Sequence, residues 1–152
     1  MPHLQLDVHA HYPAETKRNL AQRFGSLYAT IMHTTPDIVD VTIRELQDGV
    51  WHCGKDGQQP VPAAVLSLDI RAGRPPEQRA KLADALHQAC VEILRLDPEH
   101  LAAEFTQHAG NEIYRKVWID GRLVGSLARD WSPSETGKSV IDSLREEALA
   151  AR

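Results

Sequence analysis

The chain has 152 residues, of which 42% are hydrophobic and 25% are charged, and its formal net charge is −4. This composition is typical of a single globular domain, and the acidic balance argues against a nucleic-acid partner. No apolar stretch approaches the ~18 residues of a membrane span and the N-terminus is polar, so we expect neither a membrane partner nor a secretory signal.

The first element begins directly behind a proline at residue 2. The alternation of polar and apolar residues in His3–Val8 predicts a β-strand. A small side chain at position 2 lets an aminopeptidase remove Met1, which leaves Pro2 with a free secondary amine. An α-amino group has a reference pKa of about 7.7–8.0. Because a prolyl amine is more basic than this, desolvation or nearby cations must lower its pKa before it can act as a base at pH 7.

The chain then resembles itself at a distance of 62 residues. HLQLDV at 3–8 matches VLSLDI at 65–70. After each strand, apolar residues recur at the i, i+4, i+7, i+11 spacing of one helix face. These residues are Leu20, Phe24, Leu27 and Ile31 in the first half and Leu82, Leu86, Ala89 and Ile93 in the second. Short apolar strands at 38–43 and 101–105 follow the two helices.

Each half therefore predicts the order strand, helix, strand, in which the two strands run parallel with a right-handed crossover. Two such pseudo-symmetric β-α-β units side by side form a four-stranded mixed sheet with both helices on one face, an α+β fold. The other face of the sheet is left uncovered within one chain, so we expect it to be buried in an oligomer.

The repeat also predicts how the chain is divided. We expect a single domain over residues 1–131, with the first repeat at 2–57 and the second at 64–125. A proline-rich segment joins the two repeats. Residues 132–152 are expected to form a helical tail.

Two local patterns lie beyond the second repeat's last strand. Asp120-Gly121 between apolar runs predicts a hairpin with a type I′ turn within 113–124. In the tail, Ile141, Leu144 and Ala148 follow helical spacing, which predicts a surface helix.

An Arg-x-Gly-Arg group stands where the second repeat passes from strand to helix. If the halves are pseudo-symmetric, this junction lies beside the start of the first strand, and Arg71 and Arg74 therefore lie near Pro2. Two guanidinium groups at a helix N-terminus can bind a carboxylate. The same cations would lower the pKa of the Pro2 amine. The alternative is a pair of solvated loop arginines.

An N-terminal proline, a tandem β-α-β of this length and a strand–RxGR–helix junction resemble the tautomerase superfamily over residues 2–125. RPPEQR at 74–79 is similar to the EGR-x-x-EQK stretch of 4-oxalocrotonate tautomerase. IRAGR at 70–74 is closer still to the HREGR of cis-3-chloroacrylic acid dehalogenase, which also carries two fused units. The resemblance implies a tautomerase/MIF-like fold, a homotrimer and chemistry without a cofactor.

The resemblance also assigns roles to residues. Pro2 corresponds to the catalytic proline, and Arg71 and Arg74 correspond to the pair that holds and polarises the substrate carboxylate. Trp51 falls where the tautomerase has an active-site phenylalanine, which makes it a substrate-binding candidate; a core or interface tryptophan is the alternative. Tyr28 falls where the dehalogenase has a water-handling histidine and is a catalytic candidate, or a tyrosine at the core margin.

The remaining candidates depart from these relatives. Glu104 lies near the position of the dehalogenase's catalytic tyrosine, and Glu112, Tyr114 and Arg115 lie near that of its catalytic glutamate. Asp40 takes the place of the tautomerase's second arginine. Glu104 is retained as a catalytic candidate, and Tyr114 is retained as a substrate-binding candidate.

These departures bear on the reaction. Adding water to an acrylate requires a base that activates the water, and the dehalogenase's histidine and glutamate are not clearly present. Keto–enol proton transfer requires a proton shuttle at Pro2, a carboxylate clamp and a polar group opposite. The sequence therefore favours a tautomerase, an isomerase acting on a small 2-oxo or enol carboxylate. The alternatives are a cis-3-haloacrylate dehalogenase or hydratase, a 3-oxo acid decarboxylase, and a non-catalytic trimeric binding protein that retains Met1.

Histidine and cysteine add little to this interpretation. His9 and His11 lie on the same side of an extended chain, a spacing that can chelate a metal ion. The sequence offers no third ligand beyond His52, so we expect no metal. Cys53 and Cys90 lack CxxC spacing and are expected to be reduced thiols of a cytoplasmic protein.

Overall fold

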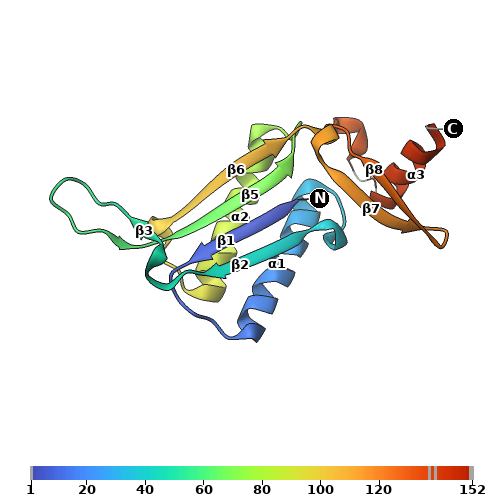
Figure 1. Cartoon of the computed structure of the whole chain (residues 1–152). Coiled ribbons are helices and arrows are strands. Elements are labelled where there is room, and N and C mark those ends of the chain that lie inside the picture. The colour runs from blue at the N-terminus through green and yellow to red at the C-terminus, as the bar shows by residue number, and fades with distance from the viewer. Residues whose placement is uncertain (1, 137, 139, 151–152) are drawn as a thin grey trace.

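The computed structural model describes residues 2–136, 138 and 140–150, without the side chains of residues 140, 141, 143 and 148. Two strand–helix–strand units form the body of the molecule (Figure 1). The first consists of β1 (His3–Val8), α1 (Ala14–Met32) and β2 (Asp40–Glu45), and the second of β5 (Ala64–Arg71), α2 (Pro76–Leu94) and β6 (Leu101–His108). Strands are parallel within each unit, and the units meet through antiparallel β1 and β5 in the order β2-β1-β5-β6. The predicted α+β fold with a mixed four-stranded sheet is confirmed.

The hydrophobic core lies between this sheet and the two helices, which pack side by side on one face (Figure 1). Side chains alternate between the two faces of a strand, so every second residue of β1 and β5 points into the core. Those that are at most 1% exposed are Leu4, Leu6 and Val8 of β1 and Leu66, Leu68 and Ile70 of β5.

The buried face of α1 differs slightly from the predicted one. Phe24 is buried as expected, but the large side chains buried after it are those of Tyr28 and Met32, while Leu27 and Ile31 are only partly buried. A four-residue spacing follows one ridge along a helix, and it is this ridge that faces the sheet. The rotation turns Tyr28 inward.

Two of the predicted strands also have different bounds. Pro36–Ile38 forms a 3-10 turn, so β2 spans Asp40–Glu45 rather than 38–43. Proline is favoured at the first position of a helical turn because its φ is already fixed near the required angle. β6 continues to His108, beyond the predicted end at 105.

Two hairpins lie at opposite ends of the sheet (Figure 1). β7 (Tyr114–Ile119) and β8 (Arg122–Leu127) form the predicted hairpin, with Asp120 at φ 49° and Gly121 at φ 76°, as a type I′ turn requires. The other hairpin was not predicted. It pairs β3 (Trp51–His52) with β4 (Val61–Pro62), so the proline-rich joint between the repeats supplies one of its strands.

The last helix, α3 (Val140–Ala150), packs against β7 and β8. It lies within the predicted helical tail, whose division from a domain ending at residue 131 stays a prediction. None of the described helices has both the length and the apolar character needed to cross a membrane.

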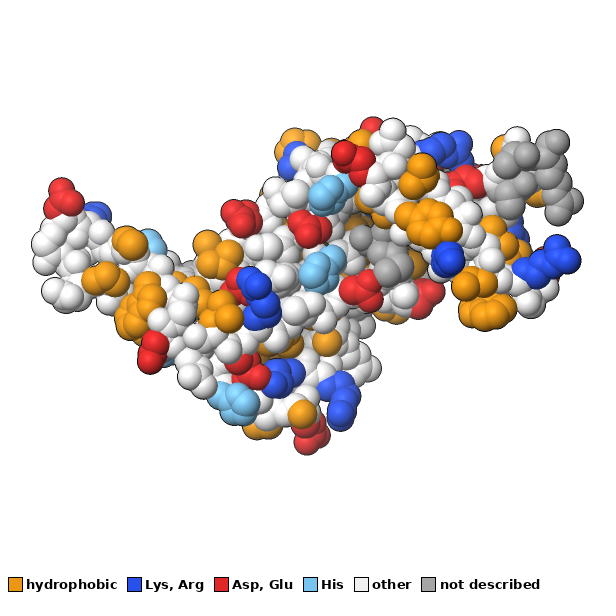
Figure 2. All heavy atoms as spheres, viewed as in Figure 1, with side chains coloured by type: hydrophobic (Ala, Val, Ile, Leu, Met, Phe, Trp, Pro, Cys, Tyr) orange, Lys and Arg blue, Asp and Glu red, His pale blue; other side chains and the backbone are white. Residues whose placement is uncertain are grey.

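The face of the sheet opposite the helices is open in the described chain. Figure 2 shows acidic, basic and histidine side chains across it. Arg44 donates to both carboxylate oxygens of Asp7 at 2.6 Å, and Ser67 donates to Glu104 at 3.4 Å. The open face is therefore polar, and its burial in an oligomer stays a prediction.

Candidate active site

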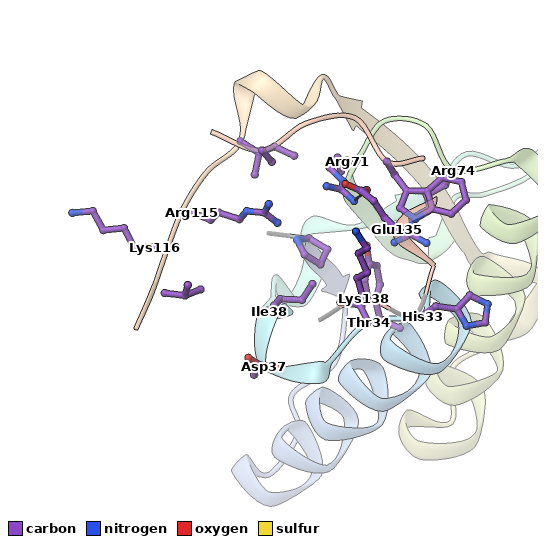
Figure 3. Close-up of a pocket in the computed structure, with 16 residues that line it drawn as sticks. His33, Thr34, Asp37, Ile38, Arg71, Arg74, Arg115, Lys116, Glu135 and Lys138 are labelled. Atoms are coloured by element: carbon purple, nitrogen blue, oxygen red, sulfur yellow. Dashed lines mark hydrogen bonds and ion pairs between the residues drawn. The ribbon is translucent and has the colours of Figure 1, made fainter. Parts of the chain in front are cut away.

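A pocket of about 120 Å³ opens where β1 begins and β5 ends. The two ends meet because β1 and β5 are antiparallel, with His3 opposite Asp69. Pro2 is buried there, and basic side chains from several elements converge on the same space (Figure 3). The pocket is lined by Pro2, Tyr28, His33, Thr34, Asp37, Ile38, Arg71, Arg74, Ile113, Arg115, Lys116, Val117, Ala128, Trp131, Glu135 and Lys138.

Arg71, the last residue of β5, is already bound to a carboxylate of the protein. Its Nη2 donates to Oε2 of Glu135 at 2.6 Å, and the two side chains are 20% and 15% exposed. A charge-assisted hydrogen bond of this length in a partly desolvated setting is a strong one. One half of the expected carboxylate clamp is therefore occupied by the chain itself.

Arg74, between β5 and α2, is 9% exposed. Its Nη1 donates to the carbonyl oxygen of Met32 at 2.6 Å, and its guanidinium lies 4.5 Å from the ring centre of Trp131. Burial lowers the pKa of Arg74 to about 10. No carboxylate of the described residues forms an ion pair with it. Because a buried cation without an anionic partner is costly, Arg74 is the best place in the pocket for the carboxylate of a ligand.

The segment that follows β8 closes one side of the pocket. The N–H of Trp131 donates to the carbonyl of Ala72 at 2.9 Å. Gly73 has a φ of 109°, and a Cβ on it would lie 2.3 Å from the carbonyl oxygen of Trp131. The glycine of the Arg-x-Gly-Arg group therefore supplies both the left-handed backbone and the room for this contact. Glu135 ends the 3-10 turn Pro133–Glu135 that follows.

A third arginine, Arg115 of β7, enters the pocket from the hairpin (Figure 3). It is 9% exposed and donates to Glu147 of α3 at 2.9 Å, while Ser126 donates to the other oxygen of that carboxylate at 2.8 Å. Burial lowers the pKa of Arg115, and the charge of Glu147 opposes this. Lys138 is paired in turn with Glu146 at 2.9 Å. α3 thus supplies carboxylates to two cations of the pocket.

Tyr28 adds a hydroxyl group from the inward ridge of α1. It is 4% exposed, and burial raises its pKa although Arg74 and Arg71 act in the opposite direction. The phenol is therefore neutral at pH 7 and can donate a hydrogen bond.

Three sequence candidates lie outside the pocket. Trp51 is 49% exposed at the far end of the sheet, because β2 runs parallel to β1 and ends away from Pro2. Glu104 lies on the open face in the middle of β6. Tyr114 is 59% exposed on β7. Within one chain, therefore, the structure does not bring these three residues to Pro2.

Several residues that the sequence indicated less strongly also lie outside the pocket. Glu112 accepts from the N–H of Ala109 in its own turn at 3.0 Å. His11 lies 2.7 Å from Glu45, whereas the His9 ring packs edge-on against Trp51. Within the described part of the chain, no three His, Cys, Asp or Glu side chains are grouped so as to hold a metal ion.

Sequence reasoning missed the pocket residues that follow the hairpin, above all Trp131 and Glu135. The order Ser-Pro-Ser-Glu at 132–135 is a capping pattern, and the N–H of Ser132 donates to Glu135 at 3.4 Å. That pattern could have predicted the turn. It could not have predicted the partner, because 64 residues separate Glu135 from Arg71.

No protein-family model matches the sequence, and no curated protein matches it either. Solved structures do. A protein called N1, a member of the cis-3-chloroacrylic acid dehalogenase family, is 20% identical, with 97% of this chain and 99% of that chain covered and a TM-score of 0.65. A wild-type fused 4-OT in a symmetric trimer is 18% identical, with coverage of 72% and 87% and a TM-score of 0.61. A malonate semialdehyde decarboxylase is 14% identical, with coverage of 78% and 90% and a TM-score of 0.57.

These similarities confirm the expected tautomerase-superfamily fold. They extend along nearly the whole chain in the case of the dehalogenase-family protein. At these identities the similarity is one of fold, so the reaction has to be argued from the pocket.

Proposed function

We propose that this protein is a tautomerase that uses Pro2 as its acid–base group on a small 2-oxo or enol carboxylate. The observation that carries the proposal is that Pro2, Tyr28 and Arg74 line one pocket. The fold shared with tautomerase-superfamily enzymes supports it. The proposal requires removal of Met1, which lies outside the described residues, because only then is the nitrogen of Pro2 a basic amine.

In this proposal the substrate carboxylate binds at Arg74. That guanidinium is buried, and no ion pair to a carboxylate engages it in the described chain. The Trp131 ring, stacked on it at 4.5 Å, keeps water from one side and fixes its plane. Arg74 thus orients the substrate with its reacting carbons toward Pro2.

Proton transfer then uses Pro2 and Tyr28. The neighbouring guanidinium groups favour the neutral amine, so Pro2 can take the proton of the enol hydroxyl. Pro2 returns this proton to the adjacent carbon, and the product is the 2-oxo acid with no atom gained or lost. While negative charge resides on the substrate oxygen, the protonated Tyr28 hydroxyl donates a hydrogen bond to it.

Ketonisation of phenylenolpyruvate, which carries a single carboxylate, tests this proposal, after intact mass has established that the protein begins at Pro2. We expect Pro2→Ala to lower the rate by at least about 100-fold, because it replaces the secondary amine that moves the proton. Arg145→Gln, an exposed change on α3, serves as the control and is expected to keep full activity. An unchanged rate in Pro2→Ala would show that the proposal is wrong.

A second candidate, a hydratase or decarboxylase, is favoured by one observation. Glu135 is a pocket carboxylate of the kind that activates water, which sequence comparison alone had not supplied. Its ion pair with Arg71 leaves it less free to act as a base, which is why tautomerisation is preferred. Chloride release from cis-3-chloroacrylate or carbon dioxide release from malonate semialdehyde, exceeding the ketonisation rate, would favour the second candidate. Intact mass showing a retained Met1 would instead favour a non-catalytic binding protein.

A further inference from the structure

The pairing of charges inside the pocket limits the charge that a ligand can carry. Arg71 is paired with Glu135 at 2.6 Å and Arg115 with Glu147 at 2.9 Å. Each of these pairs is neutral as a whole. Arg74 is the buried cation for which the described residues provide no ion pair.

Glu135 is held firmly in this arrangement. Its carboxylate contacts Arg71, and the N–H of Ser132 donates to it at 3.4 Å. The turn that carries it is anchored on the arginine loop through the hydrogen bond from Trp131 to Ala72. With a side chain only 15% exposed, Glu135 keeps much of its charge unscreened by water.

We propose that Glu135 is a specificity-determining residue that restricts the pocket to ligands with a single carboxylate. The inference rests on the proposed function for the role of Arg74 as the carboxylate site. The charges of Arg71, Arg74 and Glu135 add up to one positive charge, which the carboxylate of a monocarboxylate ligand neutralises. A dicarboxylate would bring its second charge into the same small space as Glu135, where like charges repel strongly.

Removing the charge of Glu135 should therefore change the preferred ligand. In Glu135→Gln, Arg71 loses its carboxylate and becomes available to a second anionic group. A ligand with carboxylates at both ends would then match the two guanidinium groups of the Arg-x-Gly-Arg group.

Calorimetric titration with glutarate and with its monomethyl ester tests this, because neither compound can be turned over and the pair differs by one charge. The wild-type protein is expected to bind the ester at least about tenfold more tightly than glutarate. Glu135→Gln is expected to bind glutarate at least as tightly as the ester. Asp120→Asn, which removes one negative charge at the exposed hairpin turn, is the matched control and should keep the wild-type ratio. Glu135→Asp keeps the charge and should keep the preference, which separates the effect from any loosening of the turn.

A wild-type preference for glutarate, or a ligand ratio that stays within threefold of wild type in Glu135→Gln, overturns the inference. So does a 100-fold loss of turnover in Glu135→Gln with the ligand ratio unchanged, because Glu135 would then act in proton transfer. If neither compound binds the wild-type protein, the carboxylate site itself is wrong, and the proposed function fails with it. If binding follows the expected ratios while Pro2→Ala keeps its activity, the inference stands and only the proposed reaction is wrong.

Discussion

Arg74 is a buried guanidinium held by a carbonyl and an aromatic ring rather than by a carboxylate of the described residues. Burial lowers its pKa to about 10, so it is cationic at neutral pH but loses its proton earlier than an exposed arginine. The charge that binds the ligand can therefore be titrated at alkaline pH.

We expect the affinity for the monomethyl ester of glutarate to be constant up to about pH 9 and to fall as the pH rises through about 10, by up to tenfold per pH unit. The sign follows from the charge, since only the protonated guanidinium attracts a carboxylate. The effect on folding has the opposite sign: the folded chain releases this proton before the unfolded chain does, so the penalty for burying the charge begins to fall as the pH rises above about 10. Calorimetry across this range checks the affinity, and an affinity flat to pH 11 would contradict the assignment of Arg74.

The two thiols should differ sharply in reactivity. Cys53 is exposed, whereas Cys90 is fully buried and burial raises its pKa to about 12. Because thiolates react and thiols do not, a chromogenic disulfide reagent is expected to label one thiol in the folded protein and the second only after unfolding. Cys53→Ser should abolish the fast phase, and rapid labelling that persists in this variant would contradict the burial of Cys90.

The raised pKa of Cys90 also makes the stability of the fold depend on pH. The folded state favours the neutral thiol, so this contribution to stability is complete below the usual pKa of a thiol and is lost as the pH rises toward about 12. Alkaline measurements on Arg74 therefore need a parallel stability control by circular dichroism.

At the scale of elements, α3 serves the pocket through Glu147. Its carboxylate pairs with Arg115 inside the molecule, the side chains being 13% and 9% exposed, whereas neighbouring Glu146 pairs with Lys138 near the surface. Neutralising one partner of a buried pair leaves an unpaired buried charge, which costs about 3 kcal/mol. An exposed pair contributes about 1 kcal/mol or less.

We therefore expect Glu147→Gln to lower the free energy of unfolding by about 3 kcal/mol and Glu146→Gln by about 1 kcal/mol at most. Urea unfolding of the two variants, which differ only in which of two adjacent carboxylates is lost, measures this directly. Equal effects would mean that α3 does not hold Arg115 as described.

The sequence predicted the elements that repeat, but among the strands that do not repeat it missed β3 and β4. Strand and helix periodicity, together with the 62-residue shift, predicted β1, α1, β5 and α2, because a pattern that occurs twice at the same spacing seldom arises by chance. The residue pair Asp120-Gly121 predicted the β7–β8 hairpin through local chemistry alone, and the positive φ angles of both residues agree with it. In contrast, a two-residue strand such as β3 has no periodicity from which it could be predicted.

The same contrast holds in the pocket. Arg71 and Arg74 were expected beside Pro2 because strand pairing brings the repeat junction to the first strand. Glu135 was not expected, because its contact with Arg71 depends on how the segment after β8 folds back over the sheet. Trp51 was expected near the amine from the resemblance to the tautomerase, but β2 runs parallel to β1, so within one chain Trp51 lies at the other end of the sheet.

At the scale of the whole molecule, the open face of the sheet leads us to expect a homotrimer. A four-stranded sheet with one uncovered face offers a surface for the assembly that the sequence resemblance implies. Ser67 lies near the centre of this face, beside Glu104 of the neighbouring strand.

Light scattering is expected to give a mass of about three times the 16.9 kDa chain. Ser67→Arg should shift the protein toward monomer, because a long side chain that projects from the centre of the contact would keep two close-packed surfaces apart. Gln88→Arg, on the exposed side of α2, is the control and should remain trimeric. A monomeric wild-type protein would rule out this assembly.

The pocket unites two parts of the chain that are made at very different times. Pro2 leaves the ribosome more than a hundred residues before Trp131, Glu135 and Lys138. Domains form from the N-terminal side as synthesis proceeds, so the sheet can assemble while its binding site is still open on one side. A growing chain therefore cannot hold a carboxylate in the arrangement described until residue 138 has been added, and ligand binding can report the completion of folding.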